Sequence, residues 1–264
     1  MLRYVTGPVL TGLMVLLATG PAAASDFGRS VDDEWEIHDP DRPQPSVVDP
    51  GSAPEVPRPV PSDAMVLFDG SDASAWEHRN GDEVSWKIED GYMEVVPGTG
   101  DIVTTDAFGD VQLYVEWATP ETPAGDGQAR ANSGIFLMDR YEVQLLDSYN
   151  NPTYPDGQAA AVYGQHPPLV NASRAPGDWQ SFDIIWTRPR FDDNGAPIEP
   201  ARVTVFHNGV LVHHEVELTG PTAHQSRPPY EFHPDRLPIR LQDHRGEADK
   251  IRFRSIWVRN LEKH

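Results

Sequence analysis

The chain has 264 residues, a formal net charge of -20 and no cysteine. Such an excess of negative charge argues against binding to nucleic acid or to an anionic membrane surface, because both would repel it. Without cysteine there are no disulfides and no thiolate zinc sites, so a hydrophobic core must supply the stability. Roughly two hundred residues remain after the N-terminal segments described below, enough for one large domain.

Residues 1–24 have the pattern of a secretory signal peptide. Arg3 supplies the positive charge, residues 9–18 are mostly apolar, and Ala22-Ala23-Ala24 offers a small-x-small cleavage site. We expect cleavage near Ala24 and a periplasmic or secreted protein. The apolar run is too short for a membrane span, and no other run is long enough to cross a bilayer.

Residues 25–61 form a second N-terminal segment, rich in Asp, Glu and Pro. Few apolar side chains are available to bury there, so we expect an extended, partly disordered arm. Trp35 and Ile37 are the exceptions, and they are the candidates for docking the arm onto the domain.

Residues 62–264 read as a series of short strands with turn residues between them. In chain order the strands are predicted at residues 65–68, 86–89, 92–96, 102–104, 111–117, 179–187, 202–207, 210–213, 239–244 and 252–259, with a further pair inside 127–147. No segment has a helical pattern of ten residues or more. The pattern predicts one all-β sandwich domain.

Two features between the strands carry specific expectations. Residues 148–178 contain five prolines and no sustained period, and a long loop inside a compact domain is usually functional. Asn208-Gly209 predicts a type I′ hairpin turn. His207 stands beside that turn and is expected to be exposed. His213 and His214 are adjacent on a strand, so they should face opposite ways and not share a metal.

The organising stretch is residues 127–147, which we interpret as two strands joined by a tight turn at Met138-Asp139-Arg140. In the second strand Tyr141, Val143 and Leu145 alternate with Glu142, Gln144 and Leu146, and the first set should face the core. Glu142 and Gln144 then lie on the opposite face. A carboxylate beside an amide on a rigid strand suits a sugar hydroxyl; the alternative is a solvated sheet face.

A second strand shows the same alternation. Ile239 and Leu241 should face the core, which places Arg240, Gln242 and His244 together on the other face. If this strand joins the sheet of Glu142, the combined face gathers a carboxylate, an imidazole, a guanidinium and two amides. That set can perform acid–base chemistry on a polyol. The alternative is again a polar sheet face with incidental charges.

Further candidates to bind substrate lie before and after these strands. Arg130 and Asn132 stand at the start of the preceding strand. The long loop supplies Tyr163, His166 and Asn171 as groups that could close over the face. Trp179 is either a sugar-stacking platform or a core residue. Asn171 also begins a glycosylation sequon.

Taken together, these stretches resemble the 3-keto-disaccharide hydrolase family, long known as domain of unknown function 1080. The likeness covers roughly residues 62 to 262. The matching motifs are Leu67-Phe68-Asp69-Gly70, Trp86-Lys87-Ile88-Glu89-Asp90-Gly91, Gly98-Thr99-Gly100-Asp101-Ile102, Asn132-Ser133-Gly134-Ile135-Phe136-Leu137, Tyr141-Glu142-Val143-Gln144, Asp156-Gly157-Gln158, Ala161-Val162-Tyr163-Gly164, His207-Asn208-Gly209, Leu241-Gln242-Asp243-His244 and Arg252-Phe253-Arg254-Ser255-Ile256-Trp257. Each is weak alone, and together they are specific.

The resemblance implies a concanavalin-like jelly-roll β-sandwich and action on glycosides oxidised at carbon 3 of the sugar. A 3-keto group acidifies the hydrogen on carbon 2. A base removes that hydrogen, the enolate is stabilised, the group on carbon 1 leaves by elimination, and water then adds. The expected partner is a small neutral carbohydrate, and the protein is expected to be a monomer.

On this basis Glu142 and His244 are the candidates for base and acid, with their order left open. Arg240 is the candidate to stabilise the enolate, although a bound divalent cation is an alternative and no cofactor is otherwise implied. Gln144, Asn132 and Gln242 would orient hydroxyls. Two other functional classes compete: a non-catalytic carbohydrate-binding module and a structural envelope protein. The clustered Glu, His and Arg favour chemistry, whereas a binding module would need more exposed aromatic residues.

Overall fold

The computed structural model describes Met1 and residues 34–262. The expected signal peptide, residues 1–24, and the first part of the arm therefore lie outside the described residues. In the described part of the chain, the only helical segments are two 3-10 turns, η1 (Gly127–Ala129) and η2 (Pro155–Gly157). No helix there is long and apolar enough to cross a membrane.

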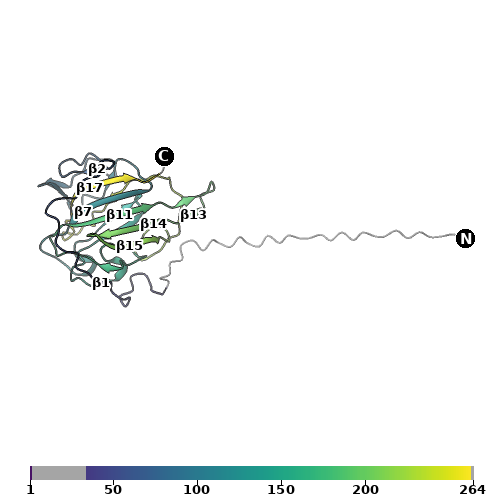
Figure 1. The fold of residues 1–264 in the computed structure, drawn as a ribbon, viewed down its shortest axis with the longest axis horizontal. Coiled ribbons are helices and arrows are strands. Elements are labelled where there is room, and N and C mark those ends of the chain that lie inside the picture. Colours follow the sequence, from purple (N-terminus) through teal and green to yellow (C-terminus); the bar gives the residue numbers. More distant parts are fainter. Residues whose placement is uncertain (2–33, 263–264) are drawn as a thin grey trace.

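Two antiparallel sheets make up the domain (Figure 1). The eight-stranded sheet has the order β15 (Val210–Glu217), β14 (Arg202–His207), β11 (Gln180–Thr187), β7 (Val111–Ala118), β17 (Arg252–Asn260), β5 (Tyr92–Glu94) and β4 (Lys87–Glu89), and β2 (Met65–Phe68) also pairs with β17. The five-stranded sheet has the order β3 (Trp76–His78), β6 (Ile102–Thr104), β16 (Arg240–Leu241), β8 (Ser133–Leu137) and β9 (Tyr141–Leu145).

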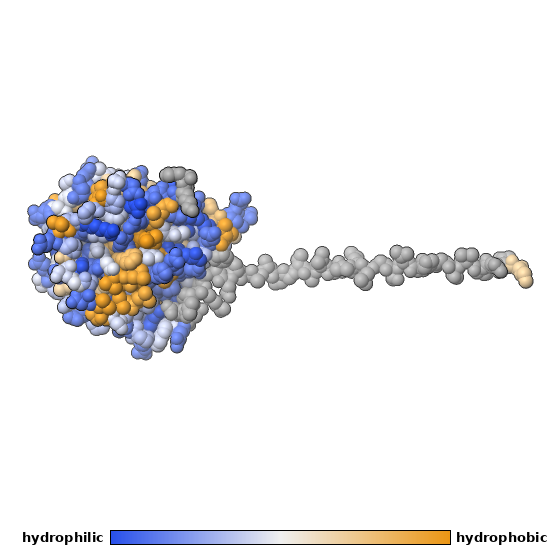
Figure 2. All heavy atoms as spheres, in the orientation of Figure 1, coloured by the Kyte–Doolittle hydropathy of each residue, from blue (hydrophilic) through white to orange (hydrophobic). Residues whose placement is uncertain are grey.

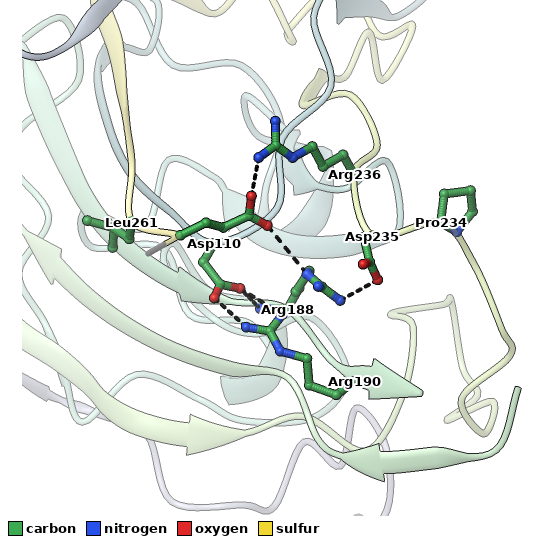
Figure 3. Close-up of a pocket in the computed structure, with 8 residues that line it drawn as sticks. Asp110, Arg188, Arg190, Pro234, Asp235, Arg236 and Leu261 are labelled. Atoms are coloured by element: carbon green, nitrogen blue, oxygen red, sulfur yellow. Dashed lines mark hydrogen bonds and ion pairs between the residues drawn. The ribbon is translucent and has the colours of Figure 1, made fainter. Parts of the chain in front are cut away.

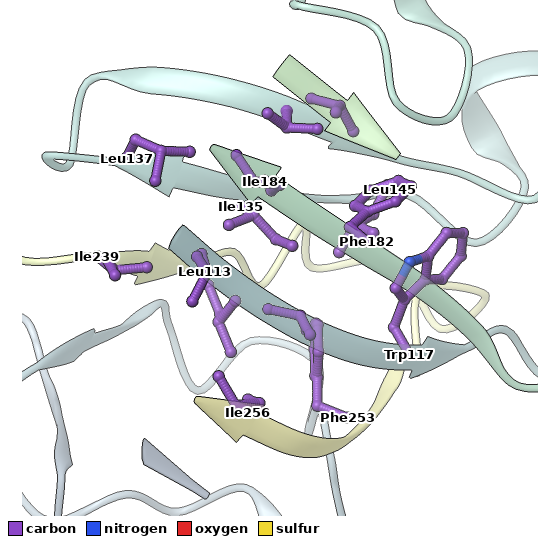
Figure 4. Packing of buried hydrophobic residues seen from close by; sticks show 14 of the residues in the cluster. Leu113, Trp117, Ile135, Leu137, Leu145, Phe182, Ile184, Ile239, Phe253 and Ile256 are labelled. Atoms are coloured by element: carbon purple, nitrogen blue, oxygen red, sulfur yellow. The ribbon is translucent and has the colours of Figure 1, made fainter. Parts of the chain in front are cut away.

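The core lies between these sheets. Figure 4 shows side chains of β7, β11 and β17 meeting those of β8, β9 and the residues before β16. Trp117, Phe182 and Phe253 are among the largest fully buried side chains. Large apolar side chains from both layers replace the missing disulfides as the source of stability. The expected all-β sandwich is confirmed.

The hairpin at Asn208-Gly209 forms as predicted. Both residues have positive φ, 54° and 81°, which is the backbone of a type I′ turn. Beside it, however, His207 is only 1 % exposed. Its Nε2 lies 2.8 Å from Oε1 of Gln180, and burial lowers its pKa to about 3. The expectation that His207 is exposed was wrong, because its ring packs against those of Trp117 and Phe182.

The described part of the arm contacts the domain at defined places. His38 and Gln44 hydrogen-bond to the long loop, and β1 (Ser46–Val47) pairs in parallel with β10 (Val170–Asn171). The two remaining strands, β12 (Arg190–Phe191) and β13 (Pro197–Glu199), form a separate small hairpin. The face of the domain seen in Figure 2 is mostly hydrophilic and carries a patch of apolar residues near its centre.

We predict that Phe253→Ala is strongly destabilising. Phe253 is 0 % exposed and stacks on Trp86 with 5.9 Å between ring centroids. Removing it leaves a cavity between the sheets, so the free energy of unfolding should fall by about 3–5 kcal/mol. Urea unfolding followed by circular dichroism measures this. Ile185→Ala, at a position 39 % exposed on the same sheet, is the control and should change stability by less than about 1 kcal/mol.

Candidate active site

The polar face of the five-stranded sheet brings the two predicted strands together. β16 pairs with β8, and β8 pairs with β9, so Arg240 and Glu142 both stand opposite Phe136. Gln144 stands opposite Gly134. The shared face expected from the sequence is therefore present. The stretch 127–147 differs in one detail, since its first residues form η1 and the first strand begins only at Ser133.

A polar cleft of about 260 Å³ opens on this face. It is lined by Asn132, Phe136, Glu142, Gln144, Tyr163, Thr222, Ala223, His224, Gln242 and His244. Most of these residues were predicted as site residues from the sequence. A pyranose ring carries hydroxyls around its edge and apolar C–H groups on its faces, and a cleft of amides, a carboxyl, imidazoles and one phenyl ring suits that chemistry.

Glu142 lies deep in the cleft, and a glycine makes room for it. A Cβ atom added at Gly134, its diagonal neighbour on β8, would overlap the carboxyl oxygen Oε1. With its amide oriented to face acceptors, Gln144 donates to Oε1 of Glu142 and to the carbonyl oxygen of Ser133, both at 3.0 Å. These contacts occupy Oε1 and leave Oε2 for a ligand.

Burial decides the ionisation of Glu142. The residue is 8 % exposed, and this burial raises the pKa of its carboxyl to about 8, partly opposed by the positive charge of Arg240 and reinforced by the negative charge of Asp101. Glu142 is therefore mostly protonated at neutral pH and can donate a proton. A carboxyl group with a pKa near the working pH is the usual requirement for general acid–base catalysis.

His244 is oriented by a buried carboxylate. Its Nδ1 lies 3.0 Å from Oδ2 of Asp249, which is only 3 % exposed. Asp249 is fixed in turn by backbone N–H groups of Asn132 at 2.7 Å and Gly246 at 3.0 Å. A carboxylate on Nδ1 selects the tautomer with its proton there, which leaves the lone pair of Nε2 free to accept a proton. Asp249 was not singled out from the sequence.

Arg240 is held away from the cleft. Its Nε donates to Oδ1 of Asp139 at 2.5 Å and its Nη1 to Oδ2 of Asp101 at 2.7 Å. The guanidinium lies 3.4 Å from the centroid of the Phe136 ring. Arg240 is not among the residues that line the cleft. Its charge acts on the site at a distance, and its contacts fix the ring that forms part of the floor.

Two loops build the wall opposite the strands. Thr222 docks on the edge of β9, where its Oγ1 accepts the N–H of Glu142 at 2.9 Å, and this places Ala223 and His224 over the cleft. The hydroxyl of Tyr163 hydrogen-bonds with Nδ1 of His224 at 3.2 Å and with the hydroxyl of Tyr154 at 3.0 Å. The sequence pattern did not identify Thr222 or His224.

Four residues predicted to bind substrate lie outside the cleft lining: Arg130, His166, Asn171 and Trp179. Nε of Arg130 donates a hydrogen bond to Oδ2 of Asp147 at 2.7 Å, and this contact stabilises the chain segment that follows β9. Trp179 is covered by the guanidinium of Arg254 at 4.1 Å from its ring centroid. The side chains of the other two hydrogen-bond to backbone carbonyl oxygens. His166 bonds to that of Glu217, and Asn171 bonds to that of Ser148. All four contribute to structure rather than to the surface of the cleft.

A larger hollow, of about 880 Å³, lies elsewhere, and its charges are already paired (Figure 3). Arg190 pairs with Asp110, and Arg236 pairs with Glu262. Arg188 donates to Asp235 at 2.6 Å. Each cation has its own carboxylate, so the hollow offers no net charge to a ligand. It also contains no residue predicted to belong to the site.

The described residues contain no group of three or more His, Asp or Glu side chains arranged to hold a metal ion. Both carboxylates next to the cleft, Asp101 and Asp249, are occupied by Arg240 and His244.

The chain was compared with known families and structures. Residues 63–259 match the model of the 3-keto-alpha-glucoside-1,2-lyase-like domain. A crystal structure of a candidate glycosyl hydrolase from Parabacteroides distasonis is 42% identical, with a TM-score of 0.74 over 78% of this chain and 94% of that chain. A second such protein from the same organism is 18% identical, with a TM-score of 0.55 over 76% of this chain and 94% of that chain, which is a likeness of fold alone. Among proteins of curated function, none matches the sequence.

We predict that Glu142 makes stability depend on pH. Its pKa is raised from 4.5 to about 8 in the folded state, so its contribution to stability is fully present below pH 4.5 and is lost as the pH rises through about 8. Glu142→Gln removes this dependence. Relative to the wild type, the variant should gain at least about 1 kcal/mol in the free energy of unfolding between pH 5 and pH 8.5. Urea unfolding at both pH values measures the difference. If the free energy of unfolding changed equally with pH in the wild type and in Glu142→Gln, the burial of an ionisable carboxyl would be contradicted.

Proposed function

The chain belongs to the 3-keto-alpha-glucoside-1,2-lyase-like family, and from this premise we propose that it cleaves 3-keto-glycosides by elimination followed by hydration. The observation that carries the proposal is a buried carboxyl group with raised pKa, Glu142, that shares one polar cleft with a carboxylate-oriented imidazole, His244. Elimination next to a ketone needs one base and one acid, and the cleft contains one group suited to each role.

In the first step His244 is the base. Its Nε2 takes the hydrogen from carbon 2, and the electron pair of that C–H bond forms the enolate with the carbon 3 ketone. The Asp249 carboxylate on Nδ1 stabilises the imidazolium that results. The amide of Gln242 is the donor available to the ketone oxygen, and the hydroxyl of Tyr163 binds a ring hydroxyl. The amides of Gln144 and Asn132 donate to protein acceptors, so their oxygens rather than their N–H groups can meet the sugar.

In the second step Glu142 is the acid. The enolate collapses to a carbon 1–carbon 2 double bond, the bond from carbon 1 to the glycosidic oxygen breaks, and the Oε2 proton of Glu142 goes to that oxygen. Water then adds its hydroxyl to carbon 1 and its hydrogen to carbon 2, so the net result is hydrolysis. Release of the unsaturated sugar before water adds would make the same protein a lyase.

Arg240 supports the site from outside the cleft in this proposal. Its guanidinium is held by Asp101 and Asp139, so its positive charge limits how far burial raises the pKa of Glu142. It also stacks on Phe136, whose ring can face the apolar C–H side of a sugar. The predicted signal peptide completes the proposal by placing this activity outside the cytoplasm.

The decisive experiment is product formation from 3-keto-trehalose or 3-keto-glucosides, with the unoxidised sugars as controls. We expect cleavage of the keto substrates alone, because only they have an acidified hydrogen on carbon 2. Parallel reactions with a chelator test the divalent cation. Binding of either sugar without turnover would instead identify a carbohydrate-binding module, and neither binding nor turnover would favour a structural role.

The roles of Glu142 and His244 give a second prediction. With Glu142 as the acid, kcat/KM should fall as the pH rises through about 8, since the required proton is then lost. Glu142→Gln should lower kcat by about 10²–10⁴-fold on an alkyl glycoside, yet much less on a 4-nitrophenyl 3-keto-glucoside, whose leaving oxygen needs no proton.

His244→Gln should lower kcat on both substrates by similar factors, because proton removal from carbon 2 is required in each case. The matched controls are Glu231→Gln and His214→Asn, both at exposed positions. If kcat/KM instead rises through pH 8 and Glu142→Gln affects both substrates equally, Glu142 is the base and the two roles are exchanged.

A further inference from the structure

We propose that the N-terminal arm is part of the active site, and that His38 positions the wall of the cleft formed by Tyr163 and His224. This inference rests on the proposed function for its kinetic consequences, although its structural consequence is independent of it. Sequence patterns predicted no contribution of the arm to the site. His38 touches no residue of the sheet face and does not line the cleft, so it is a positioning residue rather than a catalytic one.

His38 is fixed by a buried carboxylate in the long loop. Its backbone N–H donates to Oδ2 of Asp156 at 3.0 Å, and its Nδ1 lies 3.2 Å from Oδ1 of the same residue. Asp156 is 0 % exposed and lies in η2. Burial by itself would raise the pKa of Asp156, but the hydrogen bonds from His38 outweigh it and hold the pKa below its usual range. The arm therefore supplies partners that this buried carboxylate needs.

The ring of His38 then supports three aromatic side chains. Its centroid lies 4.0 Å from that of Tyr154, 5.0 Å from that of Tyr163 and 5.7 Å from that of His224. Tyr163 and His224 line the cleft, and their mutual hydrogen bond continues to Tyr154. A single imidazole from the arm thus contacts every member of the hydrogen-bonded chain that forms this wall.

Neighbouring residues hold the arm in register with the long loop. Gln44 donates from Nε2 to the carbonyl oxygen of Thr153 at 2.8 Å and accepts a hydrogen bond from Gln158. Beyond it, β1 pairs with β10. His38 itself has a positive φ of 61°, a conformation that is uncommon for residues other than glycine. The surrounding contacts keep the backbone in this conformation, which directs the ring between the tyrosines.

These contacts predict a specific effect on substrate binding. Tyr163 and His224 can contact the substrate only if their rings keep their places, and a displacement of about 1 Å at a binding group can cost up to 10²-fold in activity. In the proposed mechanism the wall binds the sugar, and neither Tyr163 nor His224 transfers a proton, so its loosening should raise KM more than it lowers kcat.

The test compares His38→Asn with Val47→Ala in the full chain. Asparagine tolerates positive φ and can still donate to Asp156, but it lacks the ring. Val47 is on the same arm and is 79% exposed, so its replacement controls for a general effect on the arm. We expect His38→Asn to raise KM for the keto substrate by about tenfold or more, with kcat within about threefold, and Val47→Ala to change neither.

Hydrogen exchange of the full-length proteins keeps this inference separate from the proposed function. In His38→Asn the peptides covering residues 154–165 and 219–226 should exchange faster than in the wild type, while β7 and β17 should not. This readout needs no turnover, so it tests the positioning role even if the wild type proves inactive on keto sugars. Unchanged exchange in both loops, or a loss of thermal stability with unchanged KM in an active enzyme, would overturn the inference.

Discussion

The burial of one carboxyl group on the polar face of a sheet is the constraint on which the site depends. Glu142 is kept from water by the loop that brings Thr222 and by the floor of β8, where Gly134 leaves space for its side chain. Water would stabilise the carboxylate form and return the pKa of Glu142 to its ordinary range. The glycine, the amide of Gln144 and the covering loop are thus parts of one arrangement that makes a carboxylic acid useful near neutral pH.

A second arrangement holds the positive charge of Arg240 away from the carboxyl group of Glu142. Had Arg240 pointed into the cleft, it would have ionised Glu142 by direct pairing. Asp101 and Asp139 hold its guanidinium instead, and Asp139 is further tied to Arg79 at 2.7 Å. The fixed guanidinium of Arg240 packs on the face of the Phe136 ring. Charged side chains thereby orient a ring of the cleft without lining the cleft themselves, a role that buried ion pairs can perform when every partner is satisfied.

The cleft is assembled from segments that are distant in sequence. The floor comes from β8, β9 and β16, the imidazole of His244 depends on Asp249, and the wall comes from the loops that carry Tyr163 and His224. The arm adds His38 behind that wall. A strand face by itself is flat and open, so loops have to enclose a small ligand. The arm extends that enclosure.

Alternation by itself determined much of this protein. The period of two in residues 141–145 placed Glu142 and Gln144 on one face, and the same period after Ile239 placed Gln242 and His244 on one face, because successive side chains of a strand must point in opposite directions. Turn chemistry likewise located the hairpin at Asn208-Gly209. Only the tertiary structure decided that β16 and β9 flank the same strand, that Arg240 is held by two acids, and that His38 reaches Asp156. These outcomes depend on which segments meet across long separations, and local sequence patterns contain no record of such contacts.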